Sequence, residues 1–163
     1  MDREFKEGDK AVYPAHGVGE VLGIETREIS GQRQKFYILK IMDSGMTIMV
    51  PTAKMKTVGL RDIIDEDEVD EVMEILKERD VVVDTQTWNR RYREYMDKIK
   101  TGSVYEIAEV LRDLSLLKFE KELSFGERKM LDMARNLLVR ELSVATDQSE
   151  VEINSEIQKI FKS

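Results

Sequence analysis

The sequence predicts an α+β protein in which a small antiparallel β-barrel is followed by an all-α domain of about five helices. Both prolines and seven of the nine glycines lie within the first sixty of the 163 residues. These residues separate short runs rich in β-branched and aromatic side chains, which is a β pattern. After Gly59, apolar residues recur instead at helical spacing. We therefore expect two domains, residues 1–62 and 63–163.

The β domain is predicted from three strand-like runs, VGEVLGIETREI, QKFYILKIM and MTIMV. The segments ISGQRQ and DSGM have the composition of hairpin turns, in which Gly31 and Gly45 would supply positive φ angles. About five short strands in so short a segment are typical of a strongly bent SH3-like or Tudor-like barrel. Such a barrel has a thin core, and its edge strands are open to a partner.

The α domain is predicted from helix-start signals and apolar stripes. Three Ser-x-x-Glu motifs are typical of capped helix N-termini: Ser103/Glu106, Ser124/Glu127 and Ser149/Glu152. Gly102 is a stop signal for the helix before it. From these signals and the spacing of the apolar residues we expect five helices: 65–79, 88–100, 103–118, 124–144 and 149–161.

The charge of the chain limits what it can bind alone. The net charge is −7, and residues 61–80 carry 10 acidic but only 3 basic side chains. Residues 81–102 form a basic island, with 5 basic and 3 acidic side chains. Because affinity for DNA comes largely from neutralising phosphates, an acidic protein binds DNA weakly unless a partner holds it there.

Location and chemistry are predicted mostly from missing features. A charged N-terminus without an apolar signal core, and no apolar run of about 20 residues, predict a cytoplasmic protein that does not engage a membrane. With no cysteine and only one histidine, His16, a zinc site or a histidine-based catalytic dyad would lack partners. DIIDEDEVDE lacks the glycine of a calcium-binding EF-hand loop, and no GxxxxGK[ST] phosphate loop occurs. We therefore expect no catalytic residue, no metal and no cofactor.

The only tryptophan, Trp88, allows two interpretations. Its predicted helix has one aromatic and apolar stripe, which favours a buried anchor: Trp88, Tyr92, Tyr95, Met96 and Ile99. Trp88 also lies in the first turn of this helix, beside Arg90 and Arg91. An apolar side chain flanked by arginines is what minor-groove binders insert between base steps. The stripe by itself favours the buried anchor.

Several segments together resemble the CarD/CdnL family of bacterial transcription factors, which bind RNA polymerase. They occur in the order of that family: FKEGDKAVYPAHGVGEVLGIET, VPTAKMKTVGLR, TWNRRYREYMDKIKTGSVYEIAEVLRDL and LSFGERKMLDMARNLLVREL. The β domain alone also resembles the polymerase-interacting domain of the transcription-repair coupling translocase. The ATPase motifs of that larger protein are absent here.

For the β domain, the resemblance implies a Tudor-like fold that binds the polymerase β subunit. The implied contacts are Arg27 of the IETR segment and residues of the strands around it: Leu39, Met49 and Pro51. In this family we expect a basic residue directly before the Val-Pro pair, where this chain has Met49. Strand alternation places Met49 on the face opposite Ile48 and Val50, so we favour a contact with a partner over a core position.

For the α domain, the resemblance implies contact with promoter DNA at the upstream edge of the melted region, which would stabilise the open promoter complex. The resemblance reverses the preference between the two interpretations of Trp88, so that we expect a wedge that inserts into DNA and not a buried anchor. The implied DNA-binding residues are Trp88, Arg90, Arg91, Met96, Phe125, Arg128 and Lys129. Phe125 would buttress this surface, although a staple that packs the start of its helix is nearly as good an interpretation.

The predicted protein is thus a transcription regulator that acts as a monomer at the nucleoid through RNA polymerase. Its DNA contact would be weak, in the minor groove and not sequence-specific. The alternative is an adaptor that binds polymerase and a second protein without touching DNA. A free helix-turn-helix repressor is disfavoured by the acidic charge and by the lack of a basic recognition helix.

Overall fold

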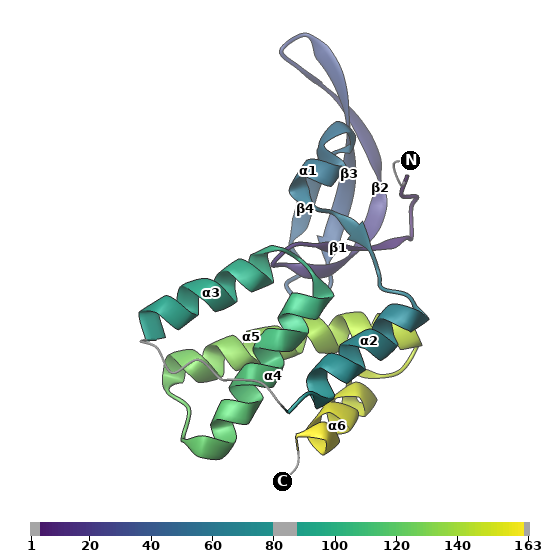
Figure 1. Ribbon diagram of the computed structural model, residues 1–163. Helices are drawn as coiled ribbons and strands as arrows, with labels where there is room; N and C mark the ends of the chain where they lie inside the picture. Colours follow the sequence, from purple (N-terminus) through teal and green to yellow (C-terminus); the bar gives the residue numbers. More distant parts are fainter. Residues whose placement is uncertain (1–3, 80–87, 162–163) are drawn as a thin grey trace. The chain divides into compact units, whose positions relative to one another are not determined.

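The computed structural model describes residues 4–79 and 88–161 and confirms the predicted fold class (Figure 1). An antiparallel sheet is followed by helices, and the chain divides into two compact units, residues 1–63 and 64–163. Each unit has its own cluster of buried apolar side chains. We refer to them as the β unit and the helical unit.

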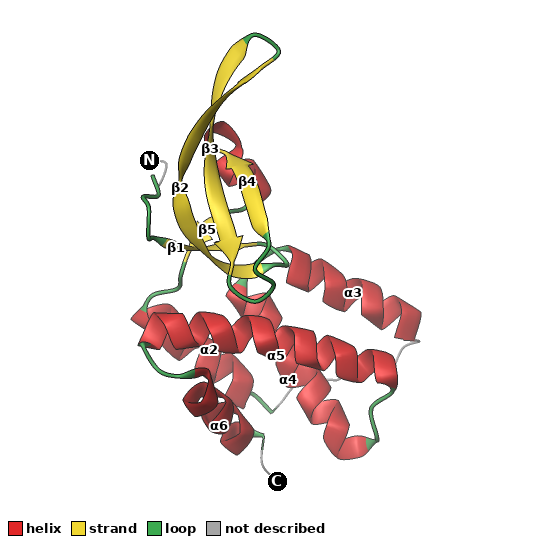
Figure 2. Cartoon of the chain, turned by 180° about the vertical axis from the view of Figure 1, so that it is seen from behind, coloured by secondary structure: helices red, strands yellow, loops and turns green. Residues whose placement is uncertain are grey.

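The β unit is a bent five-stranded antiparallel sheet (Figure 2). Its strands are β1 (Lys10–Tyr13), β2 (Gly17–Ile29), β3 (Gln32–Ile41), β4 (Thr47–Pro51) and β5 (Arg61–Asp62). Their order in the sheet is β4-β3-β2-β1-β5, so β4 and β5 are the two edges. Two short helical turns that the sequence did not predict follow β4: η1 (Thr52–Lys54) and α1 (Met55–Val58).

Both predicted hairpin turns use glycine at positive φ, as expected. Ser30 and Gly31 have φ angles of 52° and 80°, and two consecutive positive angles are typical of a type I′ hairpin turn. Gly45, between β3 and β4, has φ of 72°. The β2–β3 hairpin extends beyond the end of β4 as an exposed two-stranded arm (Figure 1).

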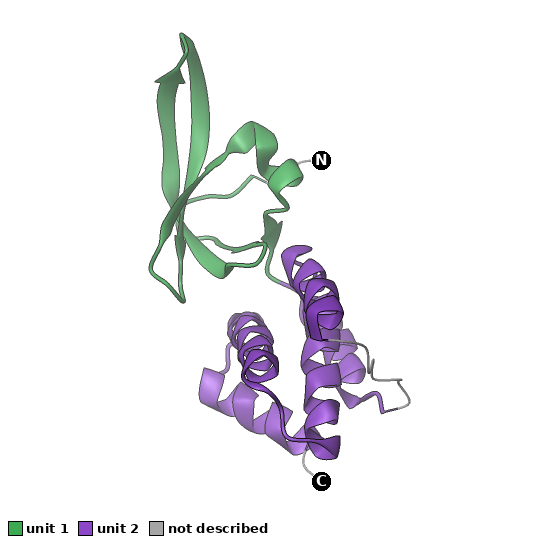
Figure 3. Cartoon of the chain, turned by 90° about the vertical axis from the view of Figure 1, so that its left-hand side faces the viewer, with its two compact units in different colours: residues 1–63 green, residues 64–163 purple. Residues whose placement is uncertain are grey.

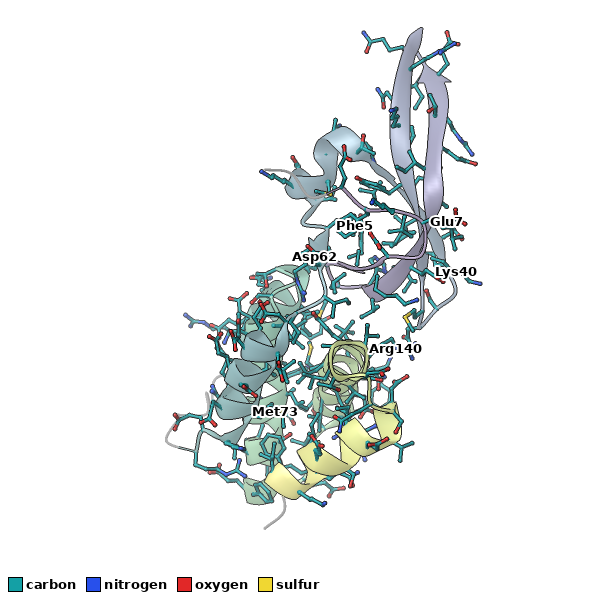
Figure 4. All side chains as sticks on the ribbon, turned by 90° about the vertical axis from the view of Figure 1, so that its right-hand side faces the viewer. Phe5, Glu7, Lys40, Asp62, Met73 and Arg140 are labelled. Carbon is teal, nitrogen blue, oxygen red and sulfur yellow. The ribbon has the colours of Figure 1, made fainter. Side chains whose placement is uncertain are left out.

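The register of β2, β3 and β4 gives the sheet two distinct faces. The core face contains Val21, Leu39 and Val50, which pack in the interior with Phe5. Figure 4 labels Phe5, whose ring meets that of Tyr37 edge-on at a centroid distance of 5.7 Å. The opposite face, called the outer face below, carries the alternate residues: Gly23, Glu25, Arg27, Gln34, Phe36, Ile38, Met49 and Pro51.

The helical unit, purple in Figure 3, is organised around one central helix. Its helices are α2 (Glu66–Lys77), α3 (Trp88–Lys100), α4 (Val104–Glu120), α5 (Phe125–Thr146) and α6 (Glu150–Ile160). Helices α2, α3 and α5 all contact α4, which is therefore buried around much of its circumference. The predicted stripe of α4 is fully buried: Ile107, Val110, Leu111 and Leu114.

The helix caps only partly follow the sequence prediction. Ser124 and Glu127 form a complete, reciprocal capping box at the start of α5. The Ser149 hydroxyl accepts from the Glu152 amide, but Ser103 makes no side-chain cap. Glu106 bonds instead with the Thr101 hydroxyl, which removes it from the predicted box. A capping box that the prediction missed lies at the start of α2, between Asp65 and Glu68.

Two matched serine substitutions test these caps. Ser124→Ala is expected to destabilise the helical unit by about 1 to 2 kcal/mol, because it leaves the Glu127 amide without an acceptor. Ser103→Ala should cost less than about 0.5 kcal/mol, because its hydroxyl caps nothing. Denaturant unfolding followed by far-ultraviolet circular dichroism measures both. Equal losses would contradict the assignment of the caps.

Candidate nucleic-acid interface and docking face

Trp88 lies at the start of α3 and is half-buried against the helical core. Its indole rests on the backbone of Gly126 in the first turn of α5. A Cβ atom added at Gly126 would lie 2.8 Å from the indole Nε1, closer than real contacts allow. Glycine at this position therefore allows the indole to lie close to the start of α5.

Other side chains hold the same indole from further directions. The ring centroids of Tyr92 and Tyr95 lie 5.8 and 6.4 Å from that of Trp88, in edge-on and tilted arrangements. Tyr95 is buried, whereas Tyr92 is 46% exposed. Trp88 is thus neither a fully buried anchor nor a free wedge, and each of the two interpretations describes part of its surface.

The structure corrects the expectation for Arg91. Its side chain is buried, and its Nη2 donates to Glu127 Oε2 at 3.0 Å. The guanidinium also lies over the indole of Trp88, 5.2 Å from the ring centroid. Arg91 follows Trp88 by about one helical turn, so its side chain points toward α5. There it pairs with Glu127, and its charge does not face outward to bind a phosphate.

Glu127 is the acceptor at the centre of this arrangement. Its Oε1 accepts from the Ser124 backbone N–H at 2.9 Å and from Lys121 Nζ at 3.0 Å, while Oε2 accepts from Arg91. Burial alone would raise the pKa of this carboxyl. The hydrogen bonds from Ser124, Lys121 and Arg91 outweigh burial and lower the pKa from 4.5 to about 2. Glu127 is therefore an anion at neutral pH, and it joins α3 to the start of α5.

The predicted residues around the indole are mostly exposed. Phe125 is 71% exposed, so the staple interpretation is wrong. Lys129 Nζ lies 5.3 Å from the centroid of the Phe125 ring, a cation–π distance. Met96 is only half-buried and packs partly against the helical core. Four exposed cations have no ion pair with any residue of 4–79 or 88–161: Arg90, Arg93, Arg128 and Lys129.

Three of the four predicted polymerase contacts lie on the outer face of the sheet. Met49, which is 36% exposed, and Pro51 pair with Ile38 and Phe36 of β3, and Arg27 lies farther along the same face. The core interpretation of Met49 is therefore wrong. Leu39 is the exception: it is fully buried on the core face, because strand alternation turns it away from Ile38. Leu39 therefore cannot contact a partner directly and can only pack beneath the outer face.

Gly126 and Tyr92 belong to this site, although sequence reasoning did not select them. Gly126 carried a usable signal, because glycine inside a helix costs about 1 kcal/mol and so indicates a close approach. Tyr92 was counted only as a member of the stripe. Glu127 was predicted as a capping residue. Its bond to Arg91 could not be predicted, because the two residues are 36 positions apart and no local sequence pattern links them.

The described residues carry no group of three or more potential metal ligands. In the same part of the chain, no helix combines the length and the apolar character needed to cross a membrane.

The comparisons with known proteins divide the chain as the structure does. Residues 5–64 match the CarD-like/TRCF RID domain, and residues 71–158 match the CarD C-terminal domain. These two domain matches, in this order, define a class of transcription factor. The chain belongs to the CarD family of transcription factors.

One relative in sequence agrees with this assignment. The putative transcription factor YdeB of Bacillus subtilis (strain 168) is 39% identical over 153 residues, which cover 93% of this chain and 98% of that protein. Among solved structures, CdnLNt from Myxococcus xanthus is 61% identical, covers 40% of this chain and 93% of its own, and has a TM-score of 0.34. The N-terminal domain of M. xanthus CarD is 32% identical, with coverages of 38% and 83% and a TM-score of 0.32.

Acid should weaken the helical unit through Glu127. Because its pKa is lower in the folded protein, ionised Glu127 stabilises the fold above pH 4.5, and this stabilisation is lost as the pH falls toward about 2. The difference corresponds to about 3 kcal/mol. Glu127→Gln should lack this part of the pH dependence and be less stable at neutral pH by a similar amount, about 3 kcal/mol, because Arg91 stays buried without its carboxylate.

Denaturant unfolding at neutral pH and at about pH 3, followed by Trp88 fluorescence, measures this effect. Glu152→Gln is the matched control, because Glu152 holds the equivalent position of an exposed Ser-x-x-Glu start. It should alter the pH dependence little. The same acid sensitivity in wild type and Glu127→Gln would contradict the assignment.

Proposed function

We propose that the β unit docks on the RNA polymerase β subunit and that the helical unit contacts promoter DNA at the upstream edge of the melted region, where it stabilises the open complex. The observation that carries this proposal is the surface at the start of α3 and α5. There, the exposed ring of Phe125 lies beside Lys129. The same two helices also carry the exposed cations Arg90, Arg93 and Arg128, which have no acidic partner among the described residues. We call it the aromatic–basic surface: Trp88, Arg90, Tyr92, Arg93, Phe125, Arg128 and Lys129.

The chemistry of this surface suits distorted DNA. Aromatic rings stack on unpaired bases at about 1 to 3 kcal/mol per base, and this stacking tolerates any sequence. The surrounding arginines and lysine suit the phosphates on either side. Phe125 is the most exposed ring, so we assign it a direct contact together with the free edge of Trp88. Arg91 is left out, because its charge is paired with Glu127.

Docking on polymerase would compensate for the weak DNA affinity that the chain's net charge of −7 imposes. The outer face offers an apolar centre at Ile38, Met49 and Pro51, with the charged pair Glu25 and Arg27 beside it. β4 is also an edge strand, whose unpaired backbone groups suit a strand of a partner. Once tethered, the helical unit meets promoter DNA at roughly millimolar effective concentration, so weak contacts become populated.

The effect on transcription then follows from differential affinity. A ligand shifts an equilibrium only to the extent that it binds one state better than the other. Rings that stack on unpaired bases bind melted DNA better than duplex, and each 1.4 kcal/mol of difference corresponds to about a tenfold change in the equilibrium. Sequence specificity is left to polymerase, which has already selected the promoter.

Phe125→Ala is the sharpest test of the DNA contact. The ring is largely exposed, so the substitution should leave thermal stability unchanged and shorten the lifetime of the open complex by roughly tenfold, the scale of one lost stacking contact. Trp88→Ala should shorten it too, but with a loss of stability, because the indole also packs on the helical core. Competitor-challenge kinetics at one promoter measure the lifetime.

An unchanged lifetime with Phe125→Ala and with Arg128→Ala would favour the alternative function. In that case the protein is an adaptor on polymerase that does not touch DNA. Met133→Ala is a suitable control, because Met133 is an exposed apolar residue of α5 outside the aromatic–basic surface.

Reversing the charge of Arg27 tests the docking face. Arg27→Glu is expected to weaken polymerase binding by at least about tenfold, because it removes a cation from the outer face and adds repulsion beside Glu25. Arg33→Glu is the matched control: it lies on the same arm, but its partner in the register is Glu28, on the opposite face. A pull-down with the β subunit in which both variants bind alike would reject the outer face.

A further inference from the structure

We infer that Arg91, Glu127 and Gly126 are positioning residues that hold the indole of Trp88 in the orientation required at the melted promoter. This inference rests on the proposed function and deepens it. The three residues touch the indole or its support and are themselves withdrawn from DNA. They form what we call the indole seat.

Gly126 fixes where the indole can lie. The positions at which an added Cβ atom would meet the ring are Nε1 at 2.8 Å, Cε2 at 3.2 Å and Cζ2 at 3.3 Å. This edge of the ring therefore occupies the space that a side chain at position 126 would need. An aromatic ring is rigid and cannot bend aside, so even a methyl group at this position must displace it as a whole.

Arg91 fixes the ring from a second direction. Its guanidinium lies over the indole at 5.2 Å, where a planar cation gains cation–π attraction. A flexible arginine would give little control over the ring. This one is held by its bond to Glu127 and is buried among the surrounding side chains, so its position is fixed.

Glu127 connects the indole to the rest of the aromatic–basic surface. Through Ser124, the same carboxylate caps the first turn of α5, from which Phe125, Arg128 and Lys129 project. One anion thereby sets both the position of Arg91 over the indole and the start of the helix that carries the other contacts. Holding both halves in one geometry before DNA arrives avoids an ordering cost on binding.

A merely structural role for this buried pair predicts something different. Buried ion pairs often contribute little net stability, and replacing both partners by neutral residues of similar shape is frequently neutral. If Arg91 and Glu127 served only to stabilise the fold, removal of both would restore function as well as stability. If they position the indole, removal of both would restore stability alone.

The double variant Arg91→Met/Glu127→Gln separates the two roles, and Trp88 reports on its own position because it is the only tryptophan. We expect better thermal stability than in Glu127→Gln alone, because Arg91 no longer lies buried without its carboxylate. Quenching of Trp88 fluorescence by acrylamide should increase, and the open-complex lifetime should fall by roughly tenfold, equivalent to 1.4 kcal/mol. Polymerase affinity should be unchanged.

Gly126→Ala provides a second measurement without any change of charge. Displacing the indole should alter the emission and quenching of Trp88 and shorten the open-complex lifetime, and polymerase affinity should again be unchanged. Asn136→Ala is the control, because it likewise places alanine in α5, but at an exposed position away from the indole, and it should alter none of these values.

The outcomes separate the inference from the function on which it rests. If Trp88 is quenched as in wild type in both the folded double variant and Gly126→Ala, the inference is wrong, whatever the open-complex lifetime is. Altered quenching combined with a wild-type open-complex lifetime would also overturn it, provided that Trp88→Ala shortens that lifetime. If Trp88→Ala itself leaves the lifetime unchanged, the proposed function fails, and the quenching data alone decide whether these residues hold the ring.

Discussion

The arrangement at the start of α3 and α5 depends on one interaction, the buried ion pair between Arg91 of α3 and Glu127 of α5. Burying an arginine and a glutamate is costly unless their hydrogen bonds are satisfied. Here the Glu127 carboxylate is fully supplied with donors, whereas Nη1 of Arg91 is buried without a hydrogen-bond acceptor among the described residues. Glu127 receives the Ser124 amide, Lys121 and Arg91, and Arg91 covers the indole of Trp88. Helix capping, the packing of α3 on α5 and the position of the only tryptophan are therefore parts of a single arrangement.

This arrangement explains how an acidic protein can present a surface suited to DNA. The inward-facing arginine organises the site, while the outward-facing cations Arg90, Arg93, Arg128 and Lys129 remain without acidic partners among the described residues. The exposed ring of Phe125 lies in the same region of α5. Adjacent residues of one helix, Arg90 and Arg91, thus have opposite roles, because a step of about 100° along an α-helix turns one outward and the next inward.

In the β unit, the two faces of the sheet likewise have different roles. Alternation along β3 and β4 sends Leu39 and Val50 into the core and leaves Ile38 and Met49 on the outer face. Both faces of this small sheet are apolar near β4. On the outer face Phe36 is buried, whereas Ile38 and Met49 keep exposed surface that a partner could cover. The two units thereby offer surfaces of different chemistry, one apolar with a charged border and one aromatic and basic.

The sequence by itself determined the fold class, the five long helices, both glycine turns of the sheet and the family, because these follow from local periodicity, turn chemistry and motif order. It also selected Trp88, Phe125, Arg128 and Met49 as candidate site residues, although the burial of Trp88 and Phe125 stayed open. Only the tertiary structure decided that Arg91 and Leu39 face inward, that Gly126 receives the indole and that Glu127 reaches across to α3. Those outcomes depend on contacts between residues far apart in the chain, and no local pattern encodes which of two neighbouring side chains a distant helix will cover.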